Sequence, residues 1–169
     1  MVPKPAAALA DLYRADETAW LDAMVELLDL GAHEALDYEH LREFLDDMST
    51  SNRNEVENRL RVLIRHMLKW DYQPGKRSPS WRSTLNEQRE QLNQWCRQRV
   101  LRNYAEEVLA DVYPKAADQA ADDTELPLKT FPARCPYTLE YLLTFVPPRV
   151  GPDGQVLDET SVEPEGDDE

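Results

Sequence analysis

The sequence predicts an all-α protein, a single helical-bundle domain of about five to six helices over residues 9–146. Only five of the 169 residues are glycine, and long runs rich in Ala, Leu, Glu, Arg and Gln favour helix. Apolar residues recur at spacings of three and four, as on one face of a helix, and no segment alternates like a half-buried strand. The apolar fraction of 41% and charged fraction of 31% are ordinary for a globular chain of this length.

The N-terminal third is expected to form two helices. The first covers residues 9–30, with Asp16 as an alternative capped start, and Gly31 is a natural left-handed stop. The second runs from the capping residue Asp37 to about Met48, and residues 49–52 form a break. The residues of this second helix expected to face inward are Leu41, Phe44, Leu45 and Met48.

The third helix, about residues 54–72, has the most regular pattern in the chain. Two prolines and a glycine then prevent helix over residues 73–79, and Ser80 is expected to cap a fourth helix. Its apolar stripe is Trp81, Leu85, Leu92, Trp95 and Cys96, with Gln88 inside it. The apolar face of the third helix is predicted to consist of Val56, Leu60, Leu63, Ile64 and Met67.

A fifth helix is predicted over residues 101–122, where Pro114 should bend or restart it. The pattern leaves open whether the fourth and fifth helices are separate. An extended connector over residues 125–136 leads to a short last helix from Pro136 to Phe145. Residues 1–8 are expected to be a disordered lead-in, and residues 147–169 a disordered acidic tail, since residues 150–169 hold eight acids and no base.

Charge is distributed unevenly along the chain. Residues 52–102 hold twelve basic and five acidic residues, a local charge of +7, whereas the whole chain carries −14. The net charge disfavours non-specific binding of nucleic acid by the chain as a whole. Any such binding must therefore be local to the basic centre.

The basic centre contains the candidate binding residues. Arg61, Arg65 and Lys69 are spaced by four on one helix face, and this basic ridge continues through Lys76, Arg77, Arg82 and Arg89. The ridge could follow a phosphate backbone while Trp70, Tyr72 and Trp81 stack on bases. Alternatively, the bases pair with acids such as Asp46, Asp47 and Glu106, and the Trp rings belong to the core. We favour the second interpretation, because charged helix faces are commonly solvated or paired.

One group of residues hints at catalysis or metal binding. Glu39 and Glu43 would share a helix face, and His66 from an adjoining helix could complete a metal or acid–base site. No second matched helix supports such a site. A histidine at the core boundary, hydrogen-bonded to a neighbour, is the simpler interpretation, so we assign no catalytic residue, metal ligand or cofactor.

The sequence favours an interaction protein over an enzyme. It has no Gly-rich phosphate loop and no Gly-x-Ser-x-Gly elbow. Cys96 and Cys135 are at no metal or redox spacing, and no signal or membrane segment is apparent, which favours the cytoplasm. We expect a non-enzymatic helical protein that meets a protein partner through the ridge and loop from Arg61 to Arg89. The alternatives are anion or nucleic-acid binding by the same surface and, less favoured, a metal-dependent or nuclease-like enzyme around His66.

Several segments resemble the bacterial family called domain of unknown function 29, small and largely helical proteins. The most specific block runs from His66 to Pro74 and reads His-Met-Leu-Lys-Trp-Asp-Tyr-Gln-Pro. Other matching residues are Leu12-Tyr13, Asp16, Trp20, Leu36-Asp37, Arg77, Ser80-Trp81, Thr84, Arg89, Thr124 to Leu126, Phe131-Pro132 and Cys135 to Leu139. The chain differs at residues 98–100, where the family usually has a Ser/Pro break. The resemblance covers roughly residues 9–145 and implies an all-helical fold but no activity.

Overall fold

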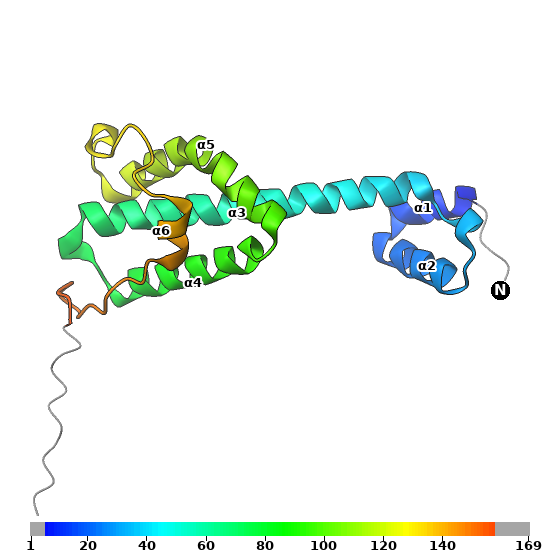
Figure 1. Ribbon diagram of the computed structural model, residues 1–169, viewed down its shortest axis with the longest axis horizontal. Coiled ribbons are helices and arrows are strands. Elements are labelled where there is room, and N and C mark those ends of the chain that lie inside the picture. The colour runs from blue at the N-terminus through cyan, green and yellow to red at the C-terminus, as the bar shows by residue number, and fades with distance from the viewer. Residues whose placement is uncertain (1–5, 158–169) are drawn as a thin grey trace, which may run out of the picture. The chain divides into compact units, whose positions relative to one another are not determined.

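The computed structural model describes residues 6–157, which form six α-helices and no strand (Figure 1). The predicted all-α fold is therefore confirmed. The chain divides into two compact units, a first unit of residues 1–51 and a second unit of residues 52–169. This division was not predicted from the sequence.

The first unit begins with two helices where the sequence pattern suggested one. Helix α1 (Ala6–Ala15) and helix α2 (Glu17–Asp29) meet at Asp16, whose backbone is extended and whose carboxylate accepts a hydrogen bond from the Ala19 amide at 3.0 Å. The alternative start at Asp16 is thus confirmed. Gly31 has φ +66, the left-handed conformation expected of a helix stop. Helix α1 starts inside the predicted lead-in, of which residues 1–5 lie outside the described residues.

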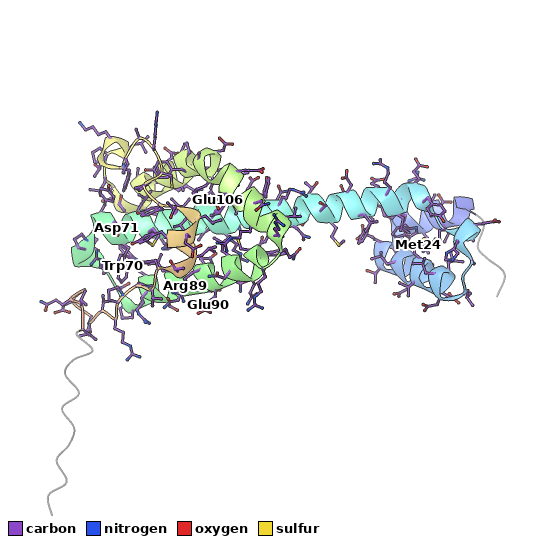
Figure 2. All side chains as sticks on the ribbon, viewed as in Figure 1. Met24, Trp70, Asp71, Arg89, Glu90 and Glu106 are labelled. Atoms are coloured by element: carbon purple, nitrogen blue, oxygen red, sulfur yellow. The ribbon has the colours of Figure 1, made fainter. Side chains whose placement is uncertain are left out.

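Asp37 joins α2 to the start of helix α3 (Tyr38–Tyr72). Its carboxylate accepts hydrogen bonds from the His40 amide at 3.4 Å and from the Trp20 indole at 3.3 Å, and lies 2.8 Å from His40 Nδ1. Burial alone would raise the pKa of Asp37, but the hydrogen bonds from His40 and Trp20 outweigh burial and lower it. The predicted cap is thus also a tertiary contact. It borders a small core, in which Figure 2 shows Met24, formed by Leu9, Trp20, Met24 and Leu27.

Helix α3 is continuous through residues 49–52, so the predicted break there is wrong. Serine, threonine and asparagine weaken a helix by less than 1 kcal/mol each, and packing at both ends of α3 outweighs so small a preference. Two of the residues expected to face inward are instead exposed, Leu45 by 52% and Met48 by 48%. The first core contacts Leu41 and Phe44 but includes neither Leu45 nor Met48, although Met48 lies on the same side of α3 one turn further along.

The second unit packs the rest of α3 with helix α4 (Pro79–Cys96), helix α5 (Arg99–Thr124) and helix α6 (Leu139–Thr144). All five apolar residues predicted for the face of residues 54–72 are buried, as are Leu85, Gln88, Leu92 and Cys96 of the predicted α4 stripe. Four of the eight buried residues of α5 are alanines, whose small side chains leave room for neighbouring helices. These buried alanines are Ala105, Ala116, Ala117 and Ala120.

Several predicted boundaries shift by a few residues. Ser78, not Ser80, caps α4 by accepting from the Trp81 amide, because Pro79 suits the first helical position. Helices α4 and α5 are separate, and Pro114 lies inside α5 without ending it. Helix α6 begins after Thr138, whose hydroxyl accepts from the Tyr141 amide at 3.1 Å.

Residues 147–157, assigned to the tail from their composition, are described and partly packed. Val150 is only 5% exposed and forms an isolated antiparallel bridge with Val156. Residues 158–169, which hold most of the acids of the predicted tail, lie outside the described residues.

The Asp37 contact predicts a specific loss of stability. Replacing Asp37 with Ala removes a helix cap and leaves the Trp20 indole N–H without an acceptor, so the free energy of unfolding should fall by about 2 kcal/mol. Asp46→Ala, an exposed carboxylate on the same helix, should change it by less than about 0.5 kcal/mol. Urea denaturation near neutral pH measures both.

The pH dependence follows from the lowered pKa of Asp37. The stabilisation is fully present above the ordinary pKa of 3.8 and is lost as pH falls through the lower value of the folded state. The difference between wild type and Asp37→Ala should therefore narrow in acid. If Asp37→Ala and Asp46→Ala lowered the free energy of unfolding equally near neutral pH, the hydrogen bonds of Asp37 to Trp20 and His40 would not stabilise the first unit.

Candidate interaction surfaces

Two cations of the basic ridge form ion pairs inside the second unit. Asp123, at the end of α5, lies 2.7 Å from Arg65 Nε and 3.0 Å from Lys69 Nζ. Burial would raise the pKa of Asp123, but hydrogen bonds from Lys69 and Arg65 outweigh it and lower the pKa. Arg65 and Lys69 thus pair with an acid of the same chain, which is the kind of pairing that we favoured over phosphate binding. The acid is Asp123, which was not among those named from the sequence.

The aromatic residues near the ridge pack within the fold. Trp70 is 2% exposed, and the Arg77 guanidinium lies 4.9 Å from its ring centroid. Lys69 Nζ lies 4.9 Å from the half-buried Trp81 ring, and Tyr72, although 37% exposed, packs edge-on against Phe131. Cation–π contacts of this kind occupy the ring faces that a nucleobase would need.

Three further arginines of the ridge, Arg77, Arg82 and Arg89, donate hydrogen bonds to backbone carbonyls. Arg77 donates to the Trp70 carbonyl at 2.9 Å and Arg82 to the Pro147 carbonyl at 3.1 Å. Arg89, labelled in Figure 2 on α4, donates to the Phe145 carbonyl at 2.9 Å and lies 3.5 Å from the neighbouring Glu90 carboxylate. The bonds from Arg82 and Arg89 hold the chain that follows α6. The Lys76 ammonium has no such partner within the described residues.

Arg61 points to a different place from Arg65 and Lys69. It donates to the Asn58 side chain and lines a pocket of about 390 Å³ between α3 and α5, while its Nε is buried without a partner. The Tyr104 hydroxyl on the other wall donates to Glu57. The charged residues that line this pocket are Glu57, Arg61, Asp111 and Lys115. Two acids and two bases give the pocket no preference for an anion.

The structure does not assemble the predicted group of His66, Glu39 and Glu43. Glu39, Glu43 and His66 all lie on the single helix α3, so they do not come from two adjoining helices as predicted. Among residues 6–157, no three His, Cys, Asp or Glu side chains are grouped so that they could hold a metal ion. The predicted hydrogen bond to His66 is also missing at Nδ1, which is buried without a partner.

His66 is uncharged near neutral pH. Burial, with the neighbouring Lys69 and Arg65 charges, lowers its pKa to about 4, while Asp123 acts in the opposite direction. A half-buried imidazole flanked by two cations can accept a proton only in acid.

The surface that sequence reasoning missed lies in the first unit. Large apolar side chains are exposed on α2, at its C-terminal end and on the first part of α3: Val25 by 56%, Leu28 by 47%, Leu30 by 66%, Tyr38 by 61%, Leu45 by 52% and Met48 by 48%. Single exposed apolar residues are ordinary, but successive ones on one helix face are less so. The sequence could have indicated this surface, because the apolar residues of α2 cover a wider arc of the helix than one core contact can bury.

The cysteines and the helix lengths add two observations. Cys96 and Cys135 are free, and burial raises the pKa of both thiols, so neither is an activated nucleophile. No helix in residues 6–157 combines the length and apolar character needed to cross a bilayer.

A comparison with protein families gives one match. The family described as domain of unknown function DUF29 matches residues 12–146, and the chain belongs to this family. The resemblance noted in the sequence is therefore confirmed. Neither the curated proteins nor the solved structures gave a match.

The pairing of Asp123 predicts a modest, salt-sensitive loss of stability. Asp123→Ala removes the partner of both Arg65 and Lys69, so the free energy of unfolding should fall by about 1 kcal/mol, and by less in about 1 M salt. Asp122→Ala removes an exposed neighbour with the same charge and should have no comparable effect. Thermal or urea denaturation distinguishes them. A salt-independent loss would mean that Asp123 acts through packing.

The lowered pKa of His66 predicts a pH-dependent loss of stability. Between about pH 6.5 and pH 4 the unfolded state binds a proton that folded His66 does not, so stability should fall as pH falls through this range. His66→Gln should remove this part of the pH dependence, whereas His33→Gln, at an exposed turn, should retain it. Urea midpoints at about pH 7 and about pH 4.5 measure the effect. An unchanged slope in His66→Gln would show that another group titrates.

Proposed function

We propose that this DUF29 protein is a non-enzymatic, cytoplasmic interaction protein whose first unit supplies the surface that meets a protein partner. The observation that carries the proposal is the concentration of exposed apolar groups. Six of the thirteen large apolar side chains exposed among the described residues belong to residues 25–48. Exposed apolar groups gathered on a small unit are typical of protein interaction sites.

The contacts of the ridge support this surface over the one between Arg61 and Arg89. Arg65, Lys69, Arg77, Arg82 and Arg89 each hold an acid or a carbonyl of the second unit. A cation engaged in this way must give up its partner before it binds a phosphate, which weakens anion or nucleic-acid binding. The two free cysteines agree with a cytoplasmic location.

The proposal predicts that a partner is lost when the first unit loses its apolar surface. Full-length protein with Val25→Ser and Leu45→Ser should no longer enrich a protein that wild type enriches from an extract of the source cells. The matched control carries Val100→Ser and Leu128→Ser in the second unit, where the exposed fractions of 64% and 52% are similar to the 56% and 52% of Val25 and Leu45. The recombinant partner should then bind the double variant with about tenfold or greater loss of affinity.

Two outcomes would contradict the proposal. One is that every enriched protein binds wild type, the double variant and the control equally. The other is binding of single-stranded DNA or RNA at physiological salt that is lost when Arg61, Arg65 and Lys69 are replaced by Gln. The second outcome would establish the nucleic-acid alternative.

A further inference from the structure

We infer that the exposed apolar side of α2 binds a basic amphipathic helix of a partner protein. This inference rests on the proposed function and names the chemistry of the partner. We call the surface the α2 apolar face, which consists of Leu21, Val25 and Leu28. Val25 and Leu28 are exposed by 56% and 47%, and Leu21 is half-buried against the first core.

The face is continuous along the helix. At 100° per residue, Leu21, Val25 and Leu28 lie within an arc of about 60° and follow one another at spacings of four and three. The buried residues Trp20 and Met24 occupy the adjoining arc. Helix α2 therefore carries one broad apolar surface, of which the core of the first unit covers only part.

Acids border the uncovered part. On the side of the face away from the core, the same geometry places Asp22, Glu26 and Asp29, all exposed. None of the three forms an ion pair within the described residues. Helix α2 contains no basic residue, and residues 1–51 hold twelve acids and three bases, a charge of −9.

The negative charge around the α2 apolar face favours a basic partner. A second copy of the chain would bring its own acid-bordered face against this one, and nucleic acid or an anionic membrane surface would be repelled. Lysine or arginine rows beside an apolar stripe would meet the acids while the stripe covers Val25 and Leu28. Because the backbone amides within α2 are bonded inside the helix, an extended strand cannot add to it, and helix-on-helix packing is the remaining mode.

Two synthetic peptides of about 18 residues test the inference against the full-length protein. Both carry Leu at i, i+3, i+4 and i+7 spacing; one has Lys at the other positions and one has Glu. Fluorescence anisotropy at about 50 mM and about 300 mM salt should show binding of the Lys peptide, weaker at the higher salt, and none of the Glu peptide. Val25→Ser with Leu28→Ser should reduce the affinity by about tenfold or more.

Two further variants separate charge from packing. Asp22→Asn, Glu26→Gln and Asp29→Asn together should weaken binding of the Lys peptide and flatten its salt dependence. Val100→Ser with Leu128→Ser should leave binding unchanged. Circular dichroism melts establish that each variant is folded.

Three results would overturn the inference: no binding of the Lys peptide, equal binding of both peptides, or binding unaffected by Val25→Ser with Leu28→Ser. Self-association in sedimentation that the same double variant abolishes would also overturn it, because the occupant would be a second copy. If a cellular partner depends on Val25 and Leu45 while neither peptide binds, the proposed function stands and this inference fails. If the Lys peptide binds as expected but no cellular partner depends on those residues, the proposed function fails.

Discussion

Helix α3 is the element on which both units depend. Its first turns give Leu41 and Phe44 to the first core, and from Val56 onward it supplies seven buried residues to the second core, as many as α5. None of its residues between Phe44 and Val56 is buried. A stretch of that kind is helical because the packed segments on either side nucleate it, since adding a residue to an existing helix costs far less than starting one. Asp37 fixes where it starts, through a cap that also binds Trp20.

The basic centre neutralises the ends of helices. Arg77 holds the carbonyl of Trp70 near the end of α3, and Arg89 holds the carbonyl of Phe145 just after α6. At the end of α5, Gln73 donates to the Thr124 carbonyl while Arg65 and Lys69 bind Asp123. Helix C-termini expose unpaired carbonyls and carry a partial negative charge. A carboxylate at such an end, as at Asp123, adds to this negative charge and destabilises the helix unless a cation pairs with it. Four of the twelve basic residues in residues 52–102, Arg65, Lys69, Arg77 and Arg89, therefore stabilise the C-terminal ends of three helices.

The sequence predicted what depends on local pattern. The face of residues 54–72, the stop at Gly31 and the cap at Asp37 all follow from spacing and residue type within one helix. It could not predict that α3 continues through residues 49–52, because weak local signals there are outweighed by packing elsewhere. Asp123 was missed as the partner of Arg65 because they are 58 residues apart and meet only in the folded chain. Leu45 was misplaced because periodicity defines a face but not how much of its arc a small core covers.

Because the first unit has a small core, covering its exposed apolar face would also affect its stability. Only Leu9, Trp20, Met24 and Leu27 of that unit are buried apolar residues among those described, and small cores are marginal on their own. A helix that covers Val25 and Leu28 would add apolar burial where the unit has little, at about 25 cal/mol for each Å² removed from water. A ligand that binds only the folded form stabilises it by mass action. Binding at the α2 apolar face would therefore also stabilise the first unit, whose core is smaller than that of the second unit.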